Sequence, residues 1–237
     1  MHRFFTAPGQ FPAITGADAH QVKDVLRMKI GERLELLTGD GHVHEAKIIN
    51  LANGRIDCEV IASRAADTEP KIKITLAQGL PKGRKMDLII EKCVELGVYQ
   101  IIPLLTERTV AKEAKLDRWQ KIAKEAAEQS KRAIIPEIKA PAKFSDVLKL
   151  KDQFGLSLIP WELEPDTTLK QVLTTPYPLP PSLSSILLLI GPEGGFSEAE
   201  VATAKQAGFV SVSLGKRILR TETAGFAALT SILYELE

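Results

Sequence analysis

Two hydrophobic patterns follow one another along this chain of 237 residues. Short alternating segments fill the first 70 residues, whereas continuous apolar segments alternate with amphipathic ones from residue 72 onward. Alternation is typical of half-buried strands, and apolar strands separated by helices are typical of a parallel sheet covered on both faces. The sequence therefore predicts an α/β protein with two domains, a small β-barrel at residues 1–70 and a parallel-sheet domain at residues 71–237.

The predicted barrel contains three strands and one helical segment. The strands are expected at residues 32–38, 42–49 and 56–62, and the helical segment at residues 18–29. A Gly39-Asp-Gly41 turn between the first two strands favours a hairpin. The polar segment 63–71 is the predicted linker to the second domain.

The predicted larger domain alternates six strands with six helices. The strands are expected at 72–78, 98–104, 134–138, 156–160, 186–190 and 209–214, and the helices at 84–96, 116–131, 144–150, 168–173, 198–207 and 222–237. Gly97 and Gly208 stand where helices commonly end, and Ser197 with Glu200 forms the pattern of a capping box.

Two unusual loops lie in the last third of the chain. Gly191-Pro-Glu-Gly-Gly195 joins an apolar strand to a capped helix, in a place where α/β proteins hold ligands. Its glycines allow backbone groups to approach a flat ligand, and Glu193 adds a carboxylate at the rim. The alternative is a tight turn with a solvated glutamate. The loop 191–195 matches neither a dinucleotide-binding fingerprint nor a P-loop.

The second loop, residues 214–220, combines three cations with apolar residues and precedes Thr221, a predicted N-cap. Arg220 places positive charge at the positive end of a helix dipole, which costs stability unless a phosphate or a base that acquires negative charge offsets it. An ordinary solvated arginine is the alternative.

Charge is unevenly distributed along the chain. Residues 71–150 carry 17 basic and 10 acidic side chains, whereas the net charge of the whole chain is +1. A basic region indicates a polyanion partner, although a solvated helix face is equally compatible. Glu125, Glu128, Gln129 and Arg132 share one helical stripe, which can be a solvated face or a nucleotide contact.

The remaining composition argues against several classes of protein. All four histidines lie within the first 44 residues, so the glycine loop has no imidazole for a metal. Cys58 and Cys93 show no metal-binding spacing and are expected to be reduced thiols of a cytoplasmic protein. The apolar run 186–190 is too short to cross a bilayer, and the first residues lack the apolar core of a signal peptide.

Several blocks together resemble the ribosomal RNA small-subunit methyltransferase E family of the SPOUT class. They are Arg3-Phe-Phe, Glu107-Arg108 and residues 25–31, 85–97, 118–130, 190–196 and 214–224. Their order and spacing are specific, and the departures, Cys93 and Glu32, fall outside the ligand loops. The resemblance implies a PUA-like barrel, a trefoil knot and a homodimer. It also implies methyl transfer from S-adenosylmethionine to N3 of a uridine in 16S rRNA.

The resemblance also implies site residues. The expected cofactor-binding residues are Trp161, Glu162, Gly191, Pro192, Glu193, Gly194, Gly195, Leu214, Gly215, Ile218, Leu219, Arg220 and Thr221. Arg220 is expected to stabilise negative charge on the uracil, and Glu193 or Glu128 to accept the N3 proton. RNA phosphates are expected to contact Arg3, Arg27, Lys82, Arg84, Lys85 and Arg132. No metal and no membrane contact are expected.

Two other functions remain open at this point. One is a knotted enzyme that modifies a ribose 2′-hydroxyl or a guanine. The other is an RNA-binding protein that has kept the fold without the activity.

Overall fold

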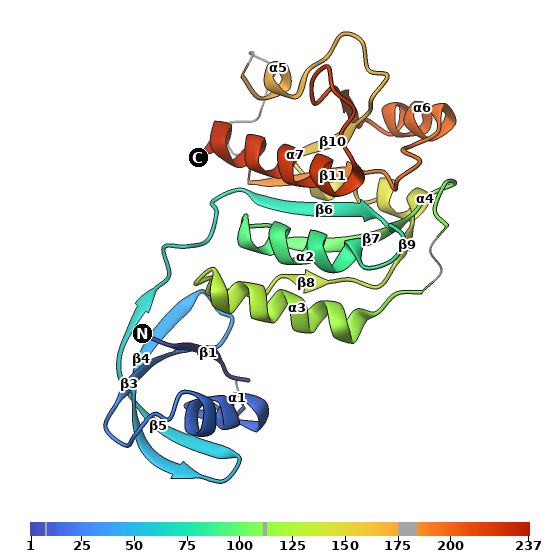
Figure 1. The fold of residues 1–237 in the computed structure, drawn as a ribbon. Helices are drawn as coiled ribbons and strands as arrows, with labels where there is room; N and C mark the ends of the chain where they lie inside the picture. The colour runs from blue at the N-terminus through green and yellow to red at the C-terminus, as the bar shows by residue number, and fades with distance from the viewer. Residues whose placement is uncertain (8, 111–112, 175–183) are drawn as a thin grey trace. The chain divides into compact units, whose positions relative to one another are not determined.

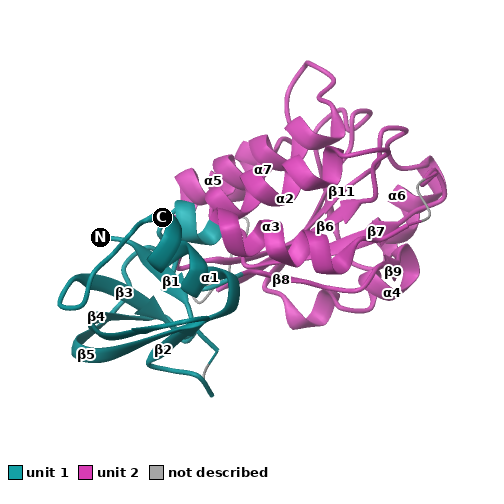
Figure 2. Ribbon diagram, turned by 60° about the horizontal axis from the view of Figure 1, so that its bottom comes forward, with its two compact units in different colours: residues 1–69, 127–135 teal, residues 70–126, 136–237 magenta. Residues whose placement is uncertain are grey.

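The computed structural model describes residues 1–7, 9–110, 113–174 and 184–237, which form two compact units (Figure 2). Unit 1 comprises residues 1–69 and 127–135, and unit 2 comprises residues 70–126 and 136–237. Residues 127–135 therefore group with the N-terminal unit, although the sequence pattern assigned them to the larger domain.

Unit 1 is built on a five-stranded sheet in the order β1-β3-β4-β5-β2 (Figure 2). The strands are β1 (Arg3–Phe5), β2 (Ala13–Thr15), β3 (Arg33–Leu37), β4 (His42–Ala52) and β5 (Arg55–Ala65). β1 pairs with β3 in parallel, and the other pairs are antiparallel. Alternate residues such as Leu34, Leu36 and Ile48 are fully buried and form the core of the unit. The three predicted strands and their hairpin are confirmed, whereas β1 and β2 are too short to show a period in the sequence.

Two predictions for unit 1 are wrong at their boundaries. The segment predicted as a linker begins inside β5, because residues 63–65 pair with His44, Val43 and His42 of β4. The predicted helix at 18–29 is a short helix α1 (Gly16–His20) followed by one π-helical turn η1 (Gln21–Val25). Arg27 then adopts a positive φ of 53°, which no helix can continue.

Unit 2 contains a seven-stranded sheet in which every pair is parallel, as predicted. The path β12-β10-β11-β6-β7-β8 consists of β12 (Val210–Val212), β10 (Leu156–Pro160), β11 (Ser185–Ile190), β6 (Lys73–Gly79), β7 (Gln100–Leu105) and β8 (Glu137–Ile138). β9 (Ala142–Lys143) also pairs with β7. The predicted strand 134–138 shrinks to two residues because the N–H of Ile134 donates to the Glu69 carboxylate instead of joining the sheet.

Helices cover both faces of this sheet (Figure 1). They are α2 (Lys85–Glu95), α3 (Leu116–Gln129), α4 (Phe144–Leu148), α5 (Leu169–Thr174), α6 (Glu198–Gln206) and α7 (Thr221–Leu236), with a 3-10 turn η2 at Lys151–Gln153. One face of β11, through Leu187 and Leu189, shares a buried cluster with α4 and α6. α7 packs over β6, β11 and α2 on the other side. Burial on both faces explains why these strands do not alternate.

Helix ends agree with the sequence signals in most places. Gly97 and Gly208 have φ values of 100° and 88°, and they follow α2 and α6 as predicted. The capping box of Ser197 and Glu200 is complete, with both reciprocal hydrogen bonds present. α6 therefore begins at a fixed point directly after the glycine loop.

Candidate active site

A pocket of about 410 Å³ opens at the carboxyl ends of β10 and β11. Its volume falls within the usual range for small-molecule sites. All thirteen residues predicted to bind a cofactor line it: Trp161, Glu162, Gly191, Pro192, Glu193, Gly194, Gly195, Leu214, Gly215, Ile218, Leu219, Arg220 and Thr221. The fold thus brings together three segments that are separated in the sequence, although the role of each residue stays a prediction.

Seven further residues line the pocket that were not among the predicted cofactor-binding residues: Lys85, which was predicted as an RNA contact, and Pro160, Ile190, Phe196, Ser213, Arg217 and Ala224. Six of them lie beside or between predicted cofactor-binding residues in the sequence, so the predicted segments already pointed to this part of the chain. Lys85 is different, because it comes from the first turn of α2, more than 70 residues before the other lining residues. Its position in the pocket follows only from the pairing of β6 with β11.

The glycine loop is held from several directions. Gly195 adopts a φ of +65°, and a Cβ atom there would stand 3.1 Å from Oε1 of Glu162. The guanidinium of Arg108 donates to the Gly194 carbonyl at 2.6 Å, and the N–H of Glu107 donates to the Glu200 carboxylate at 2.9 Å. The contacts of Gly194 and Gly195 fix the loop, and the Glu107 contact fixes the start of α6 directly after it.

Thr221 connects the two loops that form the pocket. Its hydroxyl donates to the Gly191 carbonyl at 2.5 Å and accepts from Nε2 of Gln78 at 2.8 Å. The prediction that Thr221 is the N-cap is wrong, because Arg220 occupies the N-cap position with extended φ and ψ, and Thr221 is the first helical residue. The hydroxyl is engaged within the fold and not by the backbone N–H groups of α7.

We expect Thr221→Val to destabilise the protein by about 1–3 kcal/mol, because the amide of Gln78 and the Gly191 carbonyl each lose a partner inside the fold. Urea denaturation measures this effect. Thr203→Val is the matched control, since that exposed hydroxyl bonds only to the Ala199 carbonyl one turn earlier in α6. Equal stability of the two variants would show that the bridge between the loops contributes nothing.

Glu193 forms an anchored ion pair at the rim of the pocket. Its Oε1 accepts from Nζ of Lys85 at 2.9 Å and from the N–H of Lys82 at 3.1 Å. Partial burial raises the pKa of the Glu193 carboxyl, but the hydrogen bond from Lys85 and the backbone N–H groups outweigh burial and leave the pKa below its usual value. Glu193 is therefore ionised at neutral pH, and it is a weak proton acceptor.

Replacing Lys85 by methionine is expected to raise the pKa of Glu193, because burial then opposes ionisation without the ammonium partner. Carboxyl-carbon NMR across an acidic pH titration measures the shift. In the native protein the depressed pKa gives a stability contribution that is present above the ordinary value of 4.5 and is lost as the pH falls through the folded-state pKa. An unchanged Glu193 titration in the variant would contradict the assigned cause.

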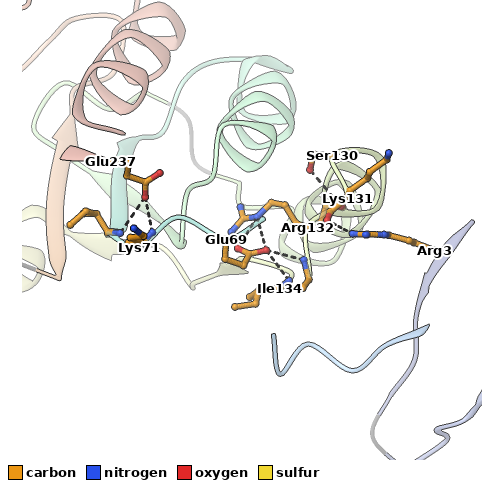
Figure 3. Close-up of polar contacts among 11 residues, drawn as sticks. Arg3, Glu69, Lys71, Ser130, Lys131, Arg132, Ile134 and Glu237 are labelled. Carbon is orange, nitrogen blue, oxygen red and sulfur yellow. Dashed lines mark hydrogen bonds and ion pairs between the residues drawn. The ribbon is translucent and has the colours of Figure 1, made fainter. Parts of the chain in front are cut away.

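Two predicted RNA contacts, Arg132 and Arg3, form ion pairs within unit 1. Arg132 is 3 % exposed, and its guanidinium pairs with the Glu69 carboxylate at 2.6 Å, with Glu69 also accepting from two backbone N–H groups (Figure 3). Nε of Arg3 pairs with Glu35 at 2.5 Å, and another of its N–H groups donates to the Lys131 carbonyl. Both arginines are thus engaged in ion pairs within the fold, and their predicted contact with RNA phosphates stays a prediction.

Glu128 does not belong to the residues that line the pocket. Its Oε1 accepts from the N–H of Phe5 at 3.4 Å in unit 1. The helical stripe that suggested Glu128, Gln129 and Arg132 as one polar surface is therefore interrupted by the turn from α3 into residues 130–135. Periodicity could not reveal this turn, in which Lys131 has a φ of 60°.

The other predicted RNA contacts are accessible. Arg27, Lys82 and Arg84 are exposed, whereas Lys85 is half-buried in its pair with Glu193. Within residues 1–7, 9–110, 113–174 and 184–237, no group of three or more histidine, cysteine or acidic side chains could hold a metal ion. No helix in those ranges is long and apolar enough to cross a membrane.

The sequence matches known RNA methyltransferases over most of its length. An RNA methyltransferase domain family matches residues 68–233, and an RNA methyltransferase PUA domain family matches residues 14–61. Ribosomal RNA small subunit methyltransferase E of Bacillus subtilis is 36% identical over 95% of this chain and 90% of its own length. The Synechocystis protein of that name is 38% identical over 100% of this chain and 78% of its own.

A solved structure extends the similarity to three dimensions. The Neisseria gonorrhoeae ribosomal RNA small subunit methyltransferase E, bound to S-adenosyl methionine, superposes with a TM-score of 0.84 at 33% identity over 98% of this chain and 96% of the other. The α/β fold with an N-terminal PUA domain is thereby confirmed. The chain belongs to the ribosomal RNA small subunit methyltransferase E family of RNA methyltransferases.

Proposed function

We propose that this protein transfers a methyl group from S-adenosylmethionine to N3 of a uridine in 16S rRNA. The observation that supports this most is the convergence of the two loops and of Trp161 and Glu162 on one pocket in unit 2. The relatives named above are small-subunit rRNA methyltransferases, and one of them binds this cofactor.

The residues of the pocket fit such a cofactor. Gly191 and Gly195 line the pocket and are partly exposed, so an adenine can lie against their backbone. A Cβ atom at Gly191 would stand 3.0 Å from the backbone of Gly195, so the loop can close this tightly only with glycine there. Trp161 and Leu214 supply apolar surface, and Glu162 supplies a carboxylate that a ribose or an ammonium group can bind. A bound sulfonium supplies an already activated methyl group, so alignment is the main task left to the protein.

The proton on N3 must leave as the new N–C bond forms, and two side chains are proposed to handle the charge. Arg220, exposed at the N-cap of α7, stabilises negative charge that develops on the uracil oxygens. Glu193 receives the proton and passes it to water. Since the lowered pKa makes Glu193 a weak acceptor, Arg220 must carry the larger share by making N3 more acidic. Glu128, which lies in unit 1 outside the pocket lining, is not assigned to this step.

The proposal includes the wider organisation implied by the family. Residues 1–70 act as a PUA-like RNA-binding domain and residues 71–237 as the methyltransferase domain, whose last strands and helix form a trefoil knot. The exposed Arg27, Lys82 and Arg84 contact RNA phosphates, and the protein works as a homodimer in the cytoplasm. The target base must be unpaired or extruded, because N3 lies on its pairing edge.

Mass spectrometry of 16S rRNA nucleosides tests this function. A strain that lacks the gene should lose 3-methyluridine, and a plasmid copy should restore it. Loss of a 2′-O-methyl nucleoside or a methylguanosine instead would assign another reaction. Calorimetric titration with S-adenosylmethionine separates an enzyme from a pure binding protein, for which no heat is expected.

A further inference from the structure

A second hollow lies beside the first turn of α2. It has a volume of about 440 Å³ and lies entirely within unit 2. The residues directly after β6, the start of α2, the start of α3 and described residues of the connection between β7 and α3 line it. We name it the α2–α3 hollow, and its lining consists of Leu80, Pro81, Gly83, Arg84, Met86, Asp87, Val110, Glu113, Lys115, Arg118 and Trp119.

The α2–α3 hollow has an apolar floor and a charged rim. Leu80, Met86 and Trp119 are between 1 % and 4 % exposed, so the floor is part of the packed interior of the unit. Three cations and two carboxylates form the rim, which lies within the most basic third of the chain. Because the floor is almost completely buried, the accessible surface of the hollow is mostly polar, which suits a ligand that combines hydrogen-bonding edges with a phosphate.

Two charged groups on this rim have a fixed geometry. Nε and Nη2 of Arg118 both donate to Oδ2 of Asp87, at 3.1 Å and 2.8 Å. The Asp87 side chain is 19% exposed and lies in the first turn of α2, where the helix dipole favours a carboxylate. A planar guanidinium held in this way can stack on a base or bind its edge, and Oδ1 of Asp87 can accept from an imino or amino group.

The α2–α3 hollow and the candidate active site share a wall. Arg84 lines the hollow and Lys85, the next residue, lines the active-site pocket. The Lys82 N–H that fixes Glu193 belongs to the same turn. Both hollows are lined by residues that follow the carboxyl ends of strands of the sheet, so one RNA strand can reach both of them.

We propose that the α2–α3 hollow binds a nucleotide of the RNA substrate that neighbours the methylated one. The base lies in the hollow above Leu80 and Trp119. Arg118 and Asp87 contact its edge or face, and Arg84 and Lys115 contact the adjoining phosphate. This inference rests on the proposed function for the identity of the RNA. It adds a second base contact, and thereby a source of sequence preference outside the methyl-transfer pocket.

Methylation of unmodified small ribosomal subunits by purified protein tests the contact. Arg118→Ala and Arg118→Lys should each raise the KM for RNA by about tenfold, the effect of one lost base contact, with unchanged affinity for S-adenosylmethionine. Lys121→Ala is the control, because it removes one charge from an exposed part of α3 outside the hollow, where Lys121 pairs with Glu125 at 3.8 Å. Wild-type KM in both Arg118 variants would overturn the proposal, as would an equal rise in Lys121→Ala.

Crosslinking gives a readout that does not depend on the reaction. RNA that carries 4-thiouridine beside the target position should crosslink to peptides containing Leu80 or Trp119, and Arg118→Ala should reduce this yield. Crosslinks confined to other segments would contradict the site. If the wild-type protein forms a nucleoside other than 3-methyluridine, the proposed function fails, and the crosslink map still decides whether the hollow holds a nucleotide.

Discussion

Gly79→Ala is expected to destabilise the protein by about 3 kcal/mol or more and to abolish binding of S-adenosylmethionine. Gly79 is the last residue of β6, and a Cβ atom there would stand 2.3 Å from the backbone nitrogen of Pro192. No side-chain rotation relieves this contact, because the Cβ atom would meet the backbone nitrogen of Pro192 and the backbone carbonyl carbon of Gly191. Either the β6 end or the glycine loop must move, and the loop forms the floor of the pocket.

The Gly79 substitution isolates a steric effect. The φ of Gly79 is not positive, so alanine can adopt the same backbone conformation without strain. Gly9→Ala is the matched control, because Gly9 also lacks a positive φ and a Cβ atom there meets nothing within 4 Å. Urea denaturation and cofactor titration measure both effects. Wild-type stability and affinity in Gly79→Ala would show that the backbones do not approach as described.

The close contact between Gly79 and the glycine loop could not be predicted from the sequence. The strands of unit 2 and the loop 191–195 were predictable because burial on both faces and a break in periodicity are local signals. Which strand passes behind the loop depends on the sheet order, in which β11 pairs with β6, more than 100 residues earlier. Neither the importance of Gly79 nor the place of Lys85 in the pocket can be recognised without that pairing.

The partners of Arg132 and Thr221 could not be predicted for a related reason. A sequence shows that a side chain is charged or polar, but not which partner the fold gives it. In the sequence, Arg132 cannot be distinguished from a surface cation, whereas in the structure it pairs with Glu69. Thr221 fits the pattern of an N-cap, whereas its hydroxyl donates a hydrogen bond to the Gly191 carbonyl. Residues whose signal is the backbone, such as Gly195, were placed correctly because conformational freedom is a property of the residue itself.

The two pocket cations that precede α7 are not equivalent to the neighbouring Lys216. Arg217 and Arg220 line the pocket, whereas Lys216 lies on the same loop, is exposed and is not part of the lining. Lys216→Ala therefore removes the same charge from the same segment. A long-range electrostatic role would make the two substitutions similar, and a direct contact with the substrate would separate them.

Arg220→Ala is expected to lower kcat by about 10²–10³-fold, the usual effect of removing one group that stabilises developing negative charge. Affinity for S-adenosylmethionine should be retained, and Lys216→Ala should turn over at the wild-type rate. Removing a cation from the N-cap of α7 relieves its repulsion with the helix dipole, so the melting temperature should not fall. Loss of turnover then cannot result from unfolding, and undiminished kcat in Arg220→Ala would exclude Arg220 as the group that stabilises the uracil anion.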